Sequence, residues 1–234
     1  MYRIWALYWY EFVGFSVSER DTINKEALVA MYMNTVLDNN ETPKSVYAFA
    51  KMNNFQESKF YSFFGNFEAL ESSIYELFFE KTMTTLNKSK DYADYDAMNK
   101  LLSFYFTFFG NLTANRSYIS KSLESEKGGL NQIKKLKPLK KKFLEFVDDL
   151  DLGGFEIKNK RLDDLKDQVV NESYWIQMLV TLKFWLDDDS ADFEKTDLFI
   201  EKSIAASFEL ASSRPLKSVV DFGKFLFKEK ISMR

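Results

Sequence analysis

Cysteine and histidine are both absent from this sequence of 234 residues. Without cysteine there can be no disulfide, no thiolate nucleophile and no cysteine-based zinc site. Without histidine the chain lacks the usual general base near neutral pH and the commonest protein ligand of metals. Both absences argue against an enzyme, and we expect neither a metal nor another cofactor.

Glycine and proline are also scarce, with 8 and 3 residues, which leaves few chain breaks and favours long helices. No apolar run is long enough to span a bilayer, so we expect no membrane partner and a cytoplasmic location. The net charge of −3 gives no overall basic signature for nucleic acid. Hydrophobic residues nevertheless make up 46% of the chain, which is enough for a packed core. These features predict an all-α protein.

The first 17 residues are unusually aromatic, with seven Phe, Tyr and Trp side chains between Tyr2 and Phe15. They lack a basic n-region and a small-residue cleavage site, so we expect no signal peptide. We interpret residues 1–17 as an aromatic N-terminal arm that adds packing. The alternative is a helix that contacts a membrane surface or a second copy of the chain.

Apolar residues spaced three and four apart predict helices along the rest of the chain. The first is expected to be capped by Ser18 or Thr22, and the second by Thr42 with Pro43 at its first position. The predicted ranges are 18–40, 43–53, 56–64, 66–87, 95–113, 115–125, 131–150, 160–187, 193–212 and 215–230.

Residues 42–70 carry a distinctive arrangement of a short helix, a tight turn, another short helix and a long helix. Their sequence is TPKSVYAFAKMNNFQESKFYSFFGNFEAL. Ala50 must be small because the two short helices cross there, and Asn54 can adopt the positive φ of a tight turn. The apolar side chains expected to hold the second short helix against the long one are Phe55, Phe60 and Phe64.

This arrangement resembles the helix-turn-helix of TetR/AcrR-family transcriptional regulators, which reads roughly T-v-x-x-I-A-x-x-a-G-v-s-x-g-t-f-Y-x-Y-F-x-s-K-e-x-L. Residues 173–210 also resemble the C-terminal domain of a branch of TetR-like proteins from Bacteroidetes-type bacteria. The resemblance implies a TetR-repressor-like fold, with a three-helix helix-turn-helix module at 18–65. A larger helical domain at 66–234 would bind a ligand and dimerise, with the helices at 160–187 and 193–212 pairing in a four-helix interface.

The implied function is a DNA-binding transcriptional regulator, a ligand-responsive repressor that binds an operator duplex as a homodimer. Lys44, Lys59 and Tyr61 would contact backbone phosphates. Gln56, Glu57, Ser58 and Ser62 would face the groove, where Glu57 could accept from a cytosine amino group.

Two features of the module oppose DNA binding. Phe67 stands where the family commonly has a lysine that grips a phosphate. Residues 19–70 also hold five basic and seven acidic side chains, a net charge of −2. The alternative is therefore a helical dimeric protein that kept the TetR fold, lost DNA binding and acts through a protein partner or a bound apolar ligand.

An aromatic run in the second half lies where TetR-like proteins line a ligand pocket. With two later side chains it would suit a small apolar or aromatic effector, although a fully packed core is the alternative. The implied pocket residues are Phe104, Tyr105, Phe108, Phe109, Trp175 and Met178.

Two charged clusters remain. The basic one could meet an acidic partner or a membrane surface, but we interpret it as a solvated helix face; it comprises Lys134, Lys135, Lys137, Lys140, Lys141 and Lys142. The acidic one could collect a divalent cation, but we interpret it as a capped turn with Asp192 near the next helix N-terminus; it comprises Asp187, Asp188, Asp189 and Asp192.

Overall fold

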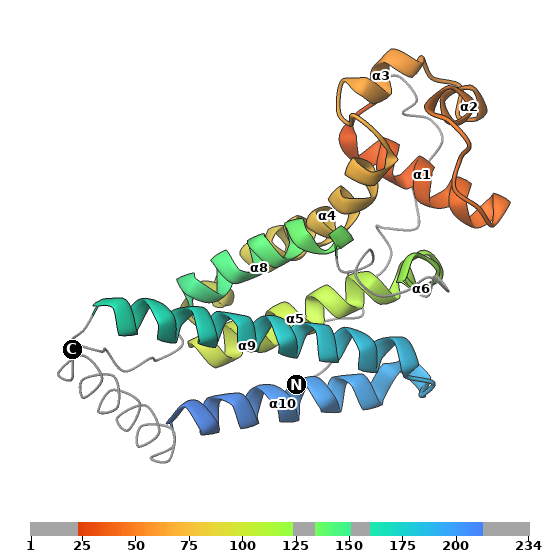
Figure 1. Ribbon diagram of the computed structural model, residues 1–234. Helices are drawn as coiled ribbons and strands as arrows, with labels where there is room; N and C mark the ends of the chain where they lie inside the picture. Colours follow the sequence, from red (N-terminus) through yellow and green to blue (C-terminus); the bar gives the residue numbers. More distant parts are fainter. Residues whose placement is uncertain (1–22, 124–133, 151–159, 213–234) are drawn as a thin grey trace, which may run out of the picture. The chain divides into compact units, whose positions relative to one another are not determined.

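The computed structural model describes residues 23–123, 134–150 and 160–212 (Figure 1). Every regular element in these ranges is a helix, which confirms the predicted all-α fold. The chain divides into two compact units after Leu70. None of the helices described is both long and apolar enough to cross a membrane. The predicted arm at 1–17 and the predicted helix at 215–230 lie outside the described residues.

Unit 1 contains α1 (Lys25–Asn39), α2 (Val46–Met52), α3 (Glu57–Tyr61) and the first turn of α4 (Phe67–Asn87). Asn24 caps α1, because its side chain accepts the Ala27 amide hydrogen. The predicted caps Ser18 and Thr22 lie outside the described residues.

The second and third helices are both shorter than predicted. Ser45 caps α2 by accepting the Ala48 amide hydrogen at 3.1 Å, so α2 begins at Val46 and Pro43 lies before it. The helix α3 ends before the predicted Phe64. The amides of Phe63 and Phe64 both donate to the Phe60 carbonyl, which closes a turn there.

The core of unit 1 is built around the Phe49 ring, which is fully buried. The rings of Tyr32, Phe55, Phe60 and Phe67 lie with their centroids 5.3–6.2 Å from it, all close to edge-to-face. Such aromatic pairs contribute about 0.5–1.5 kcal/mol beyond the area they bury. Aromatic packing therefore forms the centre of this core, and aliphatic side chains such as Leu28, Val36 and Leu70 are buried as well.

Unit 2 continues α4 and adds α5 (Ala97–Thr113), α6 (Arg116–Leu123), α8 (Lys137–Asp149), α9 (Lys160–Asp187) and α10 (Glu194–Ser212). Two short 3₁₀ helices, Lys90–Asp94 and Ala191–Phe193, precede α5 and α10. In Figure 1, α9 and α10 run side by side.

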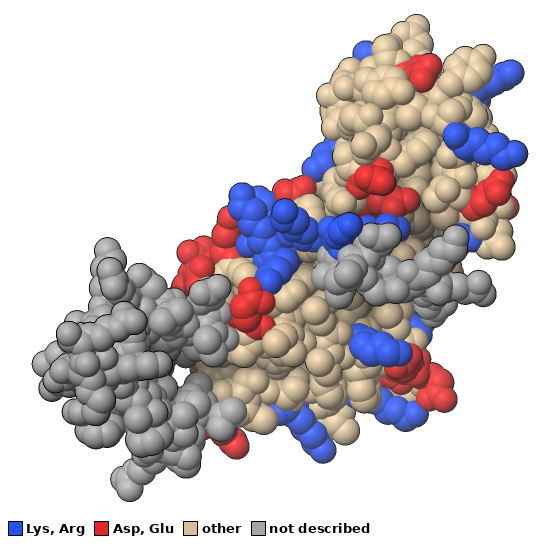
Figure 2. Space-filling view, in the orientation of Figure 1, with Lys and Arg blue, Asp and Glu red and all other residues tan. Residues whose placement is uncertain are grey.

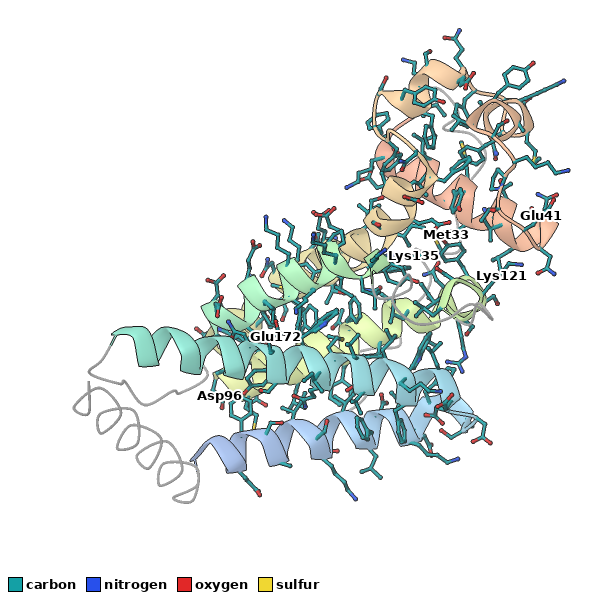
Figure 3. The ribbon with its side chains drawn as sticks, in the orientation of Figure 1. Met33, Glu41, Asp96, Lys121, Lys135 and Glu172 are labelled. Carbon is teal, nitrogen blue, oxygen red and sulfur yellow. The ribbon has the colours of Figure 1, made fainter. Side chains whose placement is uncertain are left out.

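The central helix of unit 2 is α5, whose start is capped by Asp96, labelled in Figure 3. Phe104 of α5 packs against Phe79 of α4 and against Phe143 and Phe146 of α8. On another side, the Trp185 indole of α9 donates to the Thr113 hydroxyl at 3.0 Å. Aromatic contacts thus join α4 and α8 to one central helix, and this hydrogen bond joins α9 to it.

A capped turn joins α9 to α10. The Asp188 carboxylate accepts the backbone and hydroxyl hydrogens of both Ser190 and Thr196 at 2.6–2.9 Å. The predicted capped turn is therefore confirmed, but the capping acid is Asp188. Asp192 instead takes a left-handed conformation with φ 51°.

Candidate functional site

The turn between α2 and α3 has the geometry that the sequence predicts. Asn54 adopts φ 56°, in the left-handed region that asparagine tolerates better than most residues. Ala50 is buried, and its carbonyl accepts the Phe55 amide hydrogen at 3.0 Å. The Asn53 side chain closes the turn further by donating to the Phe49 carbonyl and to the Thr35 hydroxyl.

The short helix α3 presents polar side chains to solvent. Gln56, Ser58, Lys59 and Ser62 are exposed, and Glu57 is half-buried. The Tyr61 ring is 54% exposed. Six of the seven predicted DNA-contacting residues thus fall within one stretch of seven, where a partner can reach them. The seventh, Lys44, is also exposed but lies before α2.

One hydrogen bond links two of these side chains. The Tyr61 hydroxyl donates to Glu57 Oε1 at 3.3 Å, across one turn of α3. Loss of hydration raises the pKa of Tyr61, and the charge and hydrogen bond of Glu57 raise it further. The hydroxyl therefore keeps its proton and remains a donor at neutral pH.

Unit 1 also exposes apolar side chains that the sequence analysis did not single out. Tyr47 is 62% exposed, Met52 55% and Phe63 44%. Each of Tyr47 and Met52 lies three residues from one of the buried pair Phe49 and Ala50, so helical spacing alone does not mark either side chain as exposed.

Phe67 has a structural role that explains its departure from the family's lysine. Its ring centroid lies 5.3 Å from that of Tyr32 and 5.4 Å from that of Phe60. It is also 5.8 Å from Phe49 at the centre of the core. A lysine here would remove this ring from a core made largely of aromatic contacts.

The residues predicted to line a ligand pocket are all buried in unit 2. Phe104 stacks on Phe108, and Tyr105 stacks on Phe109, with centroids 5.5 and 6.0 Å apart. The packed-core alternative fits these contacts, and the effector pocket stays a prediction. The Tyr105 hydroxyl is buried without a hydrogen-bond partner among the described residues, and burial raises its pKa well above the ordinary value.

An exposed apolar surface lies on α9 and α10. Ile176 and Val180 of α9 are 58% and 49% exposed, and Leu198 of α10 is 50% exposed. Phe184 stacks on Phe199 with centroids 4.6 Å apart, beside an open groove of about 480 Å³. We call these five residues the apolar strip.

The lysine cluster forms the blue patch over α8 in Figure 2. Much of its charge is paired: Lys135 with Glu71, Lys141 with Glu145, and Lys140 with Glu172, the last labelled on α9 in Figure 3. This agrees with the interpretation of a solvated helix face. Among the described residues, no three acidic side chains are grouped so that they could hold a metal ion.

Comparison with known proteins places the chain in a family. A family described as "Tetracyclin repressor-like, C-terminal domain" matches residues 100–226, which is more than half of the sequence. No curated protein matches. Together, the all-α fold and this match define the class of tetracycline-repressor-like proteins. The chain belongs to the TetR family.

Proposed function

We propose that this protein is a cytoplasmic, non-enzymatic transcriptional regulator that binds operator DNA as a homodimer and responds to a small apolar or aromatic effector. The observation that carries the proposal is the exposed polar face of α3, held on a rigid aromatic core by a left-handed turn at Asn54. Because α3 is already folded and held in place, it can enter a major groove without a further loss of conformational entropy. Membership of the TetR family supports this use of the module.

In the proposed complex, α3 lies in the major groove of one half-site. Lys44, Lys59 and Tyr61 contact phosphates and so fix the register of the helix on the duplex. Gln56 and the serines of α3 reach base edges and contribute sequence preference. A second protomer reads a second half-site about 34 Å along the duplex.

The apolar strip is the proposed dimer surface. Ile176, Val180 and Phe184 recur every four residues on α9, which places them on one side of that helix. Their exposure in a single chain is costly, and a second copy of the same two helices would cover them. Val180→Glu is expected to convert the dimer to monomers in analytical ultracentrifugation. A monomeric wild type, or a Val180→Glu variant that still dimerises like the control Asn99→Glu, would contradict this interface.

The effector is proposed to bind among the aromatic side chains of unit 2 and to shift the dimer between arrangements with different DNA affinity. The buried Tyr105 hydroxyl supports this placement, because buried polar groups are seldom left without a partner. An effector with one polar atom on an aromatic body would supply that partner.

DNA binding is tested with the purified full-length protein and duplexes from its own upstream region, over a salt series from about 50 to 200 mM. Binding is expected to weaken steeply with salt, because each neutralised phosphate releases counterions. On the duplex that carries the operator, Lys59→Ala and Tyr61→Phe should each lower the affinity several-fold. Lys183→Ala removes the same charge from an exposed lysine on α9 and serves as the matched control. A folded dimer that retains no DNA at the lowest salt would overturn the proposal.

A second candidate function rests on the exposed apolar side chains Tyr47, Met52 and Phe63 of unit 1. These would suit a protein partner better than a phosphate backbone, as in a TetR-fold protein that has lost DNA binding. The double variant Tyr47→Ala and Met52→Ala should then abolish a protein complex. If it leaves the partner bound while Lys59→Ala releases DNA, this candidate is excluded.

A further inference from the structure

We infer that Glu57 and Tyr61 act together as a selector for a C·G base pair, in which Glu57 withholds the Tyr61 hydroxyl from DNA until a cytosine occupies its carboxylate. The inference rests on the proposed DNA-binding function. Its starting point is the hydrogen bond from the Tyr61 hydroxyl to Glu57 Oε1, 3.3 Å long and on the exposed side of α3.

The hydroxyl of Tyr61 has a single hydrogen to donate. In the free protein that hydrogen is directed at the Glu57 carboxylate. A backbone phosphate needs the same hydrogen, so contact with DNA and contact with Glu57 exclude each other. The Tyr61 ring is 54% exposed, which leaves the hydroxyl free to turn from one acceptor to the other.

Glu57 also opposes DNA by its charge. In the part of the chain that the structure describes, no Lys or Arg forms an ion pair with it. Its unit carries a net charge of −2 over residues 19–70, so the surrounding sequence does not offset the repulsion of phosphates. On a duplex of arbitrary sequence, Glu57 therefore both repels the backbone and retains the Tyr61 hydroxyl.

A cytosine changes this balance. Its N4 amino group is a major-groove donor that suits a carboxylate, whereas guanine presents two acceptors there and thymine an acceptor and a methyl group. Adenine also has an amino donor, but its N7 acceptor lies beside it and repels a carboxylate. A carboxylate can accept more than one hydrogen bond, so the cytosine amino group need not displace the hydroxyl directly. Its hydrogen bond to Glu57 weakens the carboxylate as a competing acceptor, and the Tyr61 hydroxyl can then move to a phosphate. The contact of Glu57 with the base and the contact of Tyr61 with a phosphate are then made together. The result is weak binding to most DNA and a sharp preference at one position.

The experiment compares full-length wild type, Glu57→Ala, Glu57→Gln and Tyr61→Phe on two probes. One probe is a mixed-sequence duplex, and the other is a set of duplexes selected from a random library by each protein. Glu57→Ala should bind the mixed-sequence duplex at least about fivefold more tightly than wild type. Sites selected by the wild type should carry a C·G pair that Glu57→Gln replaces by A·T, because glutamine pairs with adenine.

Glu68→Ala is the matched control, since it removes one exposed acidic charge from the same unit. If Glu68→Ala gains as much affinity for the mixed-sequence duplex as Glu57→Ala does, only net charge matters, and this result would overturn the inference. A double-mutant cycle on the mixed-sequence duplex gives a second readout. On that duplex Glu57 retains the hydroxyl, so Tyr61→Phe should cost less than about twofold in wild type but several-fold in the Glu57→Ala background. Equal costs in both backgrounds would also overturn it.

Failure of the DNA-binding function and failure of the Glu57–Tyr61 selector would give different results. If wild type and all variants are folded dimers that retain no DNA at low salt, the DNA-binding function itself is wrong. If they bind DNA but show neither the change in base preference nor the coupling of Tyr61 to Glu57, only the selector is wrong.

Discussion

Replacing Arg116 with alanine is expected to cause a large loss of stability in unit 2. This side chain, at the start of α6, closes the end of α9. Its guanidinium donates to the carbonyls of Trp185, Leu186 and Asp188 at 2.8, 3.0 and 3.3 Å. It also lies between two rings, with its central carbon 4.6 Å from the centroids of both Trp185 and Phe193.

The backbone at this point is held in an uncommon conformation. Asp192 and Phe193 take φ of 51° and 59°, and this turn carries the Phe193 ring to the guanidinium. Left-handed conformations of residues other than glycine are strained and persist only where the surroundings hold them. Arg116 is one of the groups that hold the turn at Asp192 and Phe193 in this conformation.

The expected loss in the free energy of unfolding follows from these contacts. A hydrogen bond to a charged group contributes about 1.5–3 kcal/mol, and a cation–π contact about 0.5–1 kcal/mol at an exposed site. Arg116 is half-buried and its third hydrogen bond is long, so we take values at the low end of both energy ranges. The expected loss is about 3–5 kcal/mol for Arg116→Ala. Arg116→Lys should lose roughly half of that, because an ammonium cannot span three carbonyls as a guanidinium does.

The assay is chemical denaturation followed by tryptophan fluorescence, since Trp185 lies in the affected cluster. The matched control is Lys183→Ala, which breaks the exposed pair Lys183–Asp187 on the same end of α9 and should cost about 0.5 kcal/mol or less. An Arg116→Ala variant no less stable than this control would contradict the stabilising role of Arg116. So would an Arg116→Lys variant as stable as wild type.

Three further predictions concern other parts of the chain. Burial alone would raise the pKa of Asp188, but hydrogen bonds from Ser190 and Thr196 outweigh it and hold the pKa well below its usual value. The stability this carboxylate contributes is therefore present near neutral pH and lost below about pH 4, and Asp188→Asn should flatten that part of a pH-dependent unfolding curve. Phe49→Ala should cost about 3–5 kcal/mol and abolish DNA binding by unfolding unit 1, measured by circular dichroism; a folded variant would contradict the aromatic-core assignment. Burial lowers the pKa of Lys81 to about 8, so wild-type stability should rise between about pH 8 and 10 relative to Lys81→Met, because the unfolded chain binds more protons there. Parallel pH profiles for these two proteins would disprove the last prediction.

Local chemistry made unit 1 partly predictable from its sequence. The tight turn needs a residue that tolerates positive φ and a small residue at the helix crossing, and Asn54 and Ala50 meet these needs within a few positions of each other. The end of α9 and the start of α10 were predictable for a similar reason, because the acidic stretch at 187–189 interrupts the apolar pattern.

Other features depended on contacts between side chains that the sequence pattern does not specify. In the sequence, Phe67 stands out only because the family commonly has a lysine at its position. Its packing against Tyr32 and Phe60 in the structure identifies it as part of the core. The start of α2 depended on Ser45 reaching the Ala48 amide, which competed successfully with the Thr42–Pro43 signal.

For the candidate site, helical spacing along the chain was enough to predict which residues share α3. The same spacing brings the Tyr61 hydroxyl within reach of Glu57, four residues earlier. Which of these side chains are exposed depended on the tertiary structure, because the packing of unit 1 determines what covers α3. The same holds for the end of α9, where Arg116 binds carbonyls about 70 residues further along the chain. Contacts over such separations depend on how helices pack, and periodicity within one helix carries no information about its neighbours.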